Sequence, residues 1–125
     1  MKTKSTMTKT ANTTIQREMN NQYMQNKISS YLSLAMKAGK IASGEFMTEN
    51  AIKDGKAFLV IVATDSSDNT KKKFKDMCVY RDVPYIEFDE KDNLGHCIGK
   101  EFRACLAVLD SGFAKSVQKE FEALE

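Results

Sequence analysis

The stretch that decides the fold is AGKIASGE, residues 38–45, where one helical pattern ends and another begins. Gly39 stands where a helix commonly takes its C-terminal glycine cap, and Gly44 stands where the next helix starts. The residues between them are enough for a short strand. A helix that starts here leaves its first N–H groups without intrahelical acceptors, and these suit a phosphate or a base edge. We therefore expect a binding site at this hinge, with Lys37 and Lys40 beside its amides.

Helical patterns flank the hinge on both sides. Before it, apolar residues recur at helical spacing over residues 28–36, which predicts an amphipathic helix. After it, Ser43 or Gly44 is placed to cap a helix that runs to about Asp54 and stops at Gly55.

The rest of the chain alternates apolar runs with helical patterns. Residues 58–63 and 104–109 are continuously apolar, which is typical of strands covered on both faces. Pro84 introduces a short strand over residues 85–88. Further helices are expected from Ser67 or Asp68 through Cys78, over residues 92–98, and from Phe113 to Leu124. This alternation predicts the α/β class, as a three-layer α/β/α sandwich with about four strands in a mixed sheet and helices on both faces.

Length, composition and charge restrict the function classes. The chain has 125 residues and 42% hydrophobic content, so we expect one domain at residues 27–125 and a flexible polar tail at residues 1–26. The tail carries a net charge of +3 and the rest −1, which argues against general polyanion binding and requires a local patch for any nucleic acid. Without a membrane-length apolar run or a secretory signal, we expect a cytoplasmic protein with no membrane partner.

The cysteines predict neither a disulfide framework nor a metal site. There are three, Cys78, Cys97 and Cys105, and none forms a C-x-x-C pair. With His96 they would supply four zinc ligands, but a lone loop histidine beside small buried thiols is the favoured interpretation. We expect no metal and no cofactor.

Two other patterns resemble catalytic motifs only in part. Gly39 and Gly44 have the spacing of a phosphate-loop glycine pair, but Glu45 follows in place of lysine. Glu87 and Asp89 are expected on one side of a strand, without a histidine, nucleophile or metal motif beside them. We interpret them as a solvated strand end and expect neither an enzyme nor a small-molecule substrate.

The densest positive charge lies at residues 71–75, which include four lysines. It falls in the first turns of an expected helix, which is the unfavourable end for the helix dipole. A solvated face is the favoured interpretation, and a second phosphate contact is the alternative.

Several blocks of the sequence resemble the ribosomal protein L7Ae/L30e superfamily. They are LAMKAGKIASGE at 34–45, KAFLVIVA at 56–63 and LGHCIGK at 94–100. Two more, DSSDNTKKK at 65–73 and DSGFAK at 110–115, are similar to its bacterial YlxQ-type branch. The resemblance covers roughly residues 24–117 and implies a three-layer α/β/α sandwich that binds structured RNA, a kink-turn in the best-known members.

The resemblance implies two RNA contact regions. In the family, the second helix enters the groove beside sheared G·A pairs, and the Leu-Gly-x-x-x-Gly loop closes around an extruded nucleotide. The first region would hold Lys37, Lys40, Ser43, Gly44 and Glu45. The second would hold Leu94, Gly95, Ile98, Gly99 and Lys100.

The chain departs from the family pattern where bases are read. Kink-turn binders typically have Gly-x-Asn-Glu-x-x-Lys, and here Phe46 and Met47 replace the two polar readers while Asn50 replaces the lysine. Each good polar base contact is worth about 1–3 kcal/mol, so discrimination for kink-turns should fall, whereas phosphate contacts are unaffected.

The apolar pair leaves two interpretations open. In one, Met47 turns partly toward the core and Phe46 packs on the neighbouring loop. In the other, Phe46 is exposed and stacks on an unpaired base or anchors a protein partner, with Asn50 one turn later on the same side.

The sequence thus predicts a non-enzymatic RNA-binding protein of ribosomal type. Its partner would be a structured RNA, with ribosomal RNA among the candidates. The alternative is a protein-interaction module that keeps the fold, has lost kink-turn recognition and uses Phe46 and Met47 as its contact.

Overall fold

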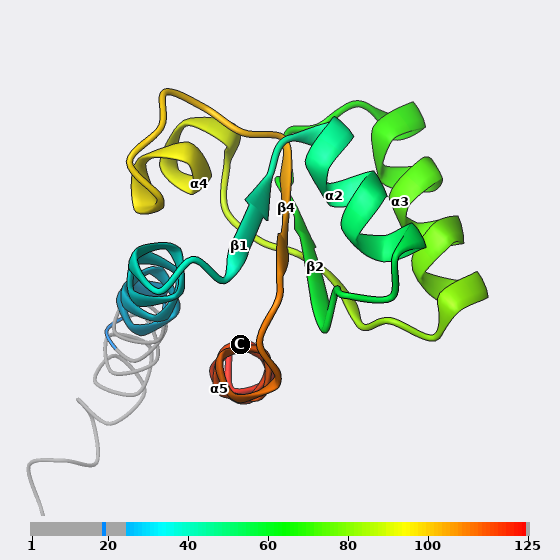
Figure 1. Ribbon diagram of the computed structural model, residues 1–125. Coiled ribbons are helices and arrows are strands. Elements are labelled where there is room, and N and C mark those ends of the chain that lie inside the picture. Colours follow the sequence, from blue (N-terminus) through cyan, green and yellow to red (C-terminus); the bar gives the residue numbers. More distant parts are fainter. Residues whose placement is uncertain (1–18, 20–24, 125) are drawn as a thin grey trace, which may run out of the picture.

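The computed structural model describes Met19 and residues 25–124 of the chain (Figure 1). An N-terminal helix occupies residues 25–37. The elements that follow are β1 (Ile41–Ser43), α2 (Glu45–Lys53), β2 (Leu59–Val62), α3 (Asp68–Arg81), β3 (Tyr85–Glu87), α4 (Lys91–Cys97), β4 (Cys105–Val108) and α5 (Ser111–Glu122). The predicted tail at residues 1–26 lies almost wholly outside the described residues.

The strands of the described part form one mixed sheet in the order β1-β4-β2-β3. Strand β4 is antiparallel to both β1 and β2, and β2 is parallel to β3. The pairing places Ser43 opposite Leu106 and Val60 opposite Ala107. The central strands β4 and β2 are the two continuous apolar runs of the sequence.

Helices cover both faces of this sheet, so the predicted sandwich is confirmed (Figure 1). Leu59 and Ile61 of β2 pack with the N-terminal helix, α4 and α5. The alternate residues Val60 and Val62 pack with α2 and α3. Because successive side chains of a strand point to opposite faces, a strand between two helical layers has no position for a polar residue.

Side-chain caps begin two of the helices. Ser67 Oγ accepts a hydrogen bond from Thr70 N at 3.1 Å at the start of α3. Of the two predicted starts, Ser67 and Asp68, Ser67 is therefore the cap. Asp110 Oδ2 accepts one from Phe113 N at 2.9 Å at the start of α5. Helix α2 has no side-chain cap, because Ser43 remains in β1 and Gly44 takes the N-cap position.

One expectation about the carboxylates is wrong. Glu87 ends β3, but Asp89 lies beyond the strand with a φ of 62°, so the two do not share a strand face. Instead Asp89 Oδ1 accepts hydrogen bonds from Glu90 N at 2.9 Å and Asn93 Nδ2 at 3.0 Å. Asp89 therefore organises the start of α4.

The thiols of Cys78 and Cys105 are small buried groups, as expected. Their exposed fractions are 1% and 0%, and burial raises the pKa of each to about 11. Cys97 is half-buried and free. Within residues 25–124, no helix has the length and apolarity that a membrane crossing requires.

The C-cap of α3 supplies a stability test. Asp82 has a φ of 59° and a ψ of 45°, a left-handed conformation that costs a residue with a Cβ free energy. We expect Asp82→Gly to raise the free energy of unfolding by about 0.5 kcal/mol, after the larger chain entropy of glycine is subtracted. Urea unfolding of the full chain measures it.

The matched control is Asp54→Gly at the C-cap of α2, where φ is −82° and glycine relieves nothing. That variant should lose about 0.5–1 kcal/mol. Equal losses in both variants would contradict the role given to the left-handed cap.

Candidate nucleic-acid interface

Residues 43–45 of the first predicted contact region lie next to the second region at the end of the sheet where β1 stops and β4 starts (Figure 1). Gly44 N donates a hydrogen bond to Cys105 O at 2.9 Å, next to the Ser43–Leu106 pair. The start of α2 and the loop before β4 are therefore neighbours, although they are far apart in sequence. We call the surface formed by residues 43–47 and 99–103 the α2–loop surface.

The start of α2 presents backbone donors. Gly44 has a φ of 87°, which glycine adopts without strain, and no side chain caps the helix. The first intrahelical bond runs from Thr48 N to Gly44 O at 3.0 Å. The N–H groups of residues 45–47 precede it and point outward from the helix end, where the dipole favours negative charge.

Arg103, which was not predicted as a site residue, joins the two regions. Its Nε donates to Ser43 Oγ at 3.4 Å and its Nη1 to the carbonyl of Phe102 at 2.7 Å. A Cβ on Gly44 would lie 3.9 Å from Arg103 Cδ. The half-buried Arg103 side chain thus lies against the start of α2. The sequence gives little indication of this role. Arg103 is a cation just before a buried strand, and only the pairing of that strand brings it to the start of α2.

The glycine loop is held by a close backbone contact. A Cβ on Gly95 would lie 2.5 Å from Phe102 Cα, so only glycine lets α4 approach the loop this closely. Lys100 N donates to Gly95 O at 2.9 Å, which closes the end of α4. The position of the loop therefore depends on Gly95.

Three residues predicted as RNA contacts are buried. Leu94 and Ile98 are 0% and 4% exposed and belong to the core, and Gly95 lies under the loop. The Leu94 and Ile98 side chains are therefore not open to a ligand, because α4 packs them on the sheet. Gly99 and Lys100 of the same motif are exposed.

The exposed part of the loop combines cations with an aromatic ring. Lys100 and Arg103 line a shallow hollow of about 630 Å³ together with His96, Gly99 and Glu101. Phe102 is 54% exposed, and Lys91 Nζ lies 6.0 Å from its ring centroid. Phe102 and Lys91 were not predicted as site residues, and nothing in their spacing marks them.

Lys37 and Lys40 do not lie beside the amides of α2, contrary to expectation. Lys40 stands before β1, where its N–H donates to Ala35 O and its carbonyl accepts from Leu109 N, both at 2.8 Å. Gly44 stands after β1. At a rise of about 3.3 Å per residue, the strand puts about 13 Å between Lys40 and Gly44. The two lysines instead flank the C-terminal end of the N-terminal helix.

Phe46 and Met47 are exposed, so the packed interpretation of this pair is wrong. Their exposed fractions are 74% and 52%. Helix α2 buries Thr48, Ala51 and Ile52, which occupy one helical face. The first turn before that face lies outside the packing, and Glu45 is exposed there too, whereas Asn50 is half-buried.

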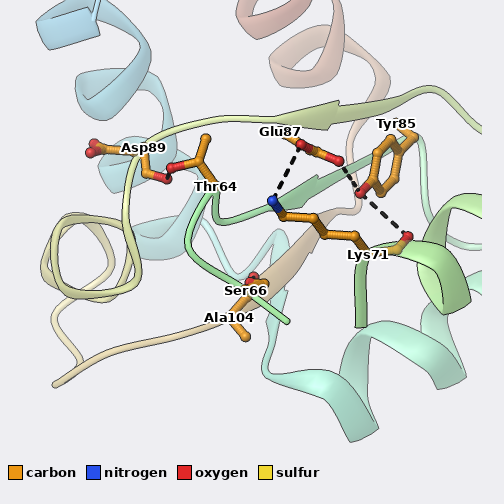
Figure 2. Close-up of polar contacts among 7 residues, drawn as sticks. All are labelled: Thr64, Ser66, Lys71, Tyr85, Glu87, Asp89 and Ala104. Atoms are coloured by element: carbon orange, nitrogen blue, oxygen red, sulfur yellow. Dashed lines mark hydrogen bonds and ion pairs between the residues drawn. The ribbon is translucent and has the colours of Figure 1, made fainter. Parts of the chain in front are cut away.

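Polar contacts tie the neighbouring turns together (Figure 2). Thr64 Oγ1 donates to Asp89 O at 2.8 Å, and Ser66 Oγ donates to Ala104 O at 3.2 Å. These bonds connect the turn after β2 to the segment before α4 and to the residue before β4. The bond to Ala104 thus holds the loop of the α2–loop surface at its C-terminal end, where it enters β4.

A second group in Figure 2 fixes the start of α3 to β3. The Tyr85 hydroxyl donates to Glu87 Oε2 at 2.9 Å, and Lys71 Nζ lies 3.8 Å from Glu87 Oε1. Burial, followed by the bond to Glu87, raises the pKa of Tyr85. This group is structural.

Three of the four lysines in the run at residues 71–75 are paired with carboxylates nearby. Each of its first three lysines has a carboxylate partner: Lys71 with Glu87, Lys72 with Asp76, and Lys73 with Glu49. Glu49 also pairs with Lys53, and hydrogen bonds from Lys53 and Lys73 lower the pKa of Glu49 to about 2. The pairs favour the solvated-face interpretation over a second phosphate contact. Elsewhere in the described chain, no group of three or more His, Cys, Asp or Glu side chains is placed to hold a metal ion.

Comparison with known proteins gives matches over most of the chain. The ribosomal protein L7Ae/L30e/S12e/Gadd45 family model matches residues 26–118. The RNA-binding protein YlxQ of Bacillus subtilis (strain 168) is 43% identical over 86 residues, which cover 69% of this chain and 86% of that protein. The RNA-binding protein YlxQ of Enterococcus faecium is 41% identical over 96 residues, which cover 77% of this chain and 92% of that protein. The large ribosomal subunit protein eL30 of Methanosarcina mazei is 34% identical, covering 75% and 91%.

Solved structures show the same architecture. A protein of unknown function from Bacillus halodurans superposes with a TM-score of 0.75 at 32% identity, covering 77% of this chain and 97% of that one. The 15.5kD RNA binding protein of Giardia lamblia superposes with a TM-score of 0.68 at 18% identity, covering 82% and 88%. At that identity the second likeness shows the fold alone.

The contact at Gly95 yields a second stability test. Gly→Ala inside a helix normally gains about 1 kcal/mol, but at Gly95 the new methyl meets the backbone of Phe102. We expect Gly95→Ala to lower the free energy of unfolding by about 1–3 kcal/mol, measured by urea unfolding.

The control is Gly112→Ala in α5, where the Cβ would meet only the Asp110 carboxylate, at 3.1 Å. It should change the free energy of unfolding by less than about 1 kcal/mol. If Gly95→Ala is as stable as the control, the close contact does not constrain the loop.

Proposed function

Because this chain belongs to the ribosomal protein L7Ae/L30e/S12e/Gadd45 family, we propose that it is a non-enzymatic protein that binds folded RNA through the α2–loop surface. The observation that carries the proposal is Arg103, which lies against both Gly44 and Ser43 and so joins the start of α2 to the loop. Two relatives bear the name RNA-binding protein, and the proposal extends that property to this chain.

The chemistry of the surface suits a phosphate backbone. Lys91, Lys100 and Arg103 stand around the loop, and the amides of residues 45–47 point outward from the start of α2, next to Ser43, which accepts a hydrogen bond from Arg103. Elsewhere, the first three lysines of α3 are paired with carboxylates. Binding should therefore be local and release few counterions, with a salt slope of about 2–3.

We infer that the partner is a folded RNA with an unpaired nucleotide, such as a kink-turn, and that G·A pairs are read more weakly than is usual in the family. Phosphate contacts fix position without reading sequence, and the donors for them are present on this surface. The positions of the usual base readers hold Phe46, Met47 and Asn50. Polar groups that would hydrogen-bond a sheared G·A pair are reduced to the Asn50 amide.

A protein-interaction module is the second candidate, and the exposure of Phe46 and Met47 favours it. Exposed aromatic side chains are common anchors of protein interfaces. This candidate predicts no measurable RNA affinity for the full chain. Location in the cytoplasm and the absence of a cofactor or metal stay predictions from the sequence.

The proposal is tested by charge removal at the two ends of β1. With the full chain and a labelled kink-turn RNA, Lys100→Ala and Arg103→Ala should each weaken binding and lower the salt slope by about 1. Lys37→Ala and Lys40→Ala remove the same charge at the opposite end of the strand and should leave both quantities unchanged. Fluorescence anisotropy at several KCl concentrations measures them.

Thermal unfolding of each variant separates loss of contact from loss of fold. If all four substitutions weaken RNA binding equally, the RNA is held by general charge attraction and not by the α2–loop surface. Absence of binding by the unaltered chain would leave the protein-interaction candidate.

A further inference from the structure

We propose that Phe46 is a stacking platform for an unpaired nucleobase, which makes the α2–loop surface selective for an unstacked nucleotide instead of for G·A pairs. The inference rests on the proposed function and deepens it, because it names what the same surface selects. It assigns to Phe46 a role in specificity, beside the positioning role of the cations.

The first support is the position of the ring. Phe46 is 74% exposed, compared with 46% for Phe58 and 54% for Phe102. It lies in the first turn of α2, beside the outward-pointing amides and outside the buried face formed by Thr48, Ala51 and Ile52. An aromatic face open to solvent at a helix start is available to a flat ligand, and every base offers such a face.

The second support is the set of groups around the ring. Asn50 follows Phe46 by four residues, so the two lie on the same side of α2 one turn apart. An amide can both donate to and accept from a base edge. A ring that stacks and an amide that reads the edge are the pair with which proteins recognise splayed-out nucleotides.

The third support is the charge next to the ring. The Arg103 guanidinium stem lies against Gly44, two residues before Phe46, and can hold the phosphate of a stacked nucleotide. Glu45 adds the one negative side chain of this turn, but it precedes by one turn Glu49, which pairs with Lys73 of α3, so Glu45 lies on the side of α2 that faces α3.

A protein partner fits this surface less well. Phe46 and Met47 are only two apolar side chains, with polar Glu45 and Asn50 as their neighbours on α2, whereas a stable protein interface buries about 800 Å² on each side. Phosphate, by contrast, is complementary to the amides and the guanidinium. The surface therefore fits a nucleotide better than an apolar face of another protein.

The experiment uses the full chain and three RNAs: a kink-turn, the same RNA with its G·A pairs replaced by Watson–Crick pairs, and a duplex without unpaired nucleotides. In the first two, 2-aminopurine replaces each unpaired base in turn. We expect fluorescence quenching at one position in both RNAs. The affinities for these two should agree within about threefold, and the duplex should bind at least tenfold more weakly.

Variants at Phe46 identify the stacking partner. Phe46→Leu keeps an apolar side chain without the ring and should lose the quenching and about tenfold in affinity, which corresponds to about 1.4 kcal/mol. Phe46→Tyr keeps the ring and should retain both. The double variant Phe46→Asn with Met47→Glu restores the family's polar pair and should make binding depend on the G·A pairs.

The outcomes separate this inference from the proposed function. If Phe46→Leu binds and quenches as the unaltered chain does, while Arg103→Ala weakens binding, the stacking role is wrong and the RNA surface stands. If no RNA binds the unaltered chain, both fail. If Phe46→Leu leaves RNA binding intact but abolishes self-association or capture of a protein, Phe46 belongs to a protein interface.

Discussion

The pairing of β1 with β4 is the interaction on which the candidate site depends. It runs through the Ser43–Leu106 pair and the Gly44 N to Cys105 O bond of 2.9 Å. Because these partners are some sixty residues apart in sequence, only this pairing brings the start of α2 to the loop before β4. Arg103 stands at that junction, and its hydrogen bond to Ser43 follows directly from the register.

The sequence predicted the elements of the fold well because each has a local cause. The apolar run around β2 has no polar position since helices cover both faces. Ser67 caps α3 through a hydrogen bond from Thr70, which follows it by three residues. Glycines at positions 39 and 44 both adopt positive φ angles, as turns at helix ends require. Such features depend on neighbours in the chain, so a pattern in the sequence can reveal them.

The site was predicted only in part, because its geometry is set by contacts distant in sequence. Lys40 and Gly44 are close in the chain, yet a strand carries them to opposite ends of the sheet. Leu94 and Ile98 belong to the glycine motif but pack into the core. Arg103 and Phe102 gain their places from strand pairing and from the contact with Gly95, which no local pattern records. Exposure of Phe46 was one of two open interpretations, and it follows from which face of α2 the sheet buries.

Amide hydrogen exchange of the full chain, free and saturated with a kink-turn RNA, tests the central claim most directly. The account predicts slower exchange in the bound state at residues 44–47 and 99–103 together, because both sides of the β1–β4 junction contact the RNA. Residues 37–40 and 71–75 should exchange at the same rate in both states. Protection confined to residues 37–40 or 71–75, with no change at the α2–loop surface, would contradict it.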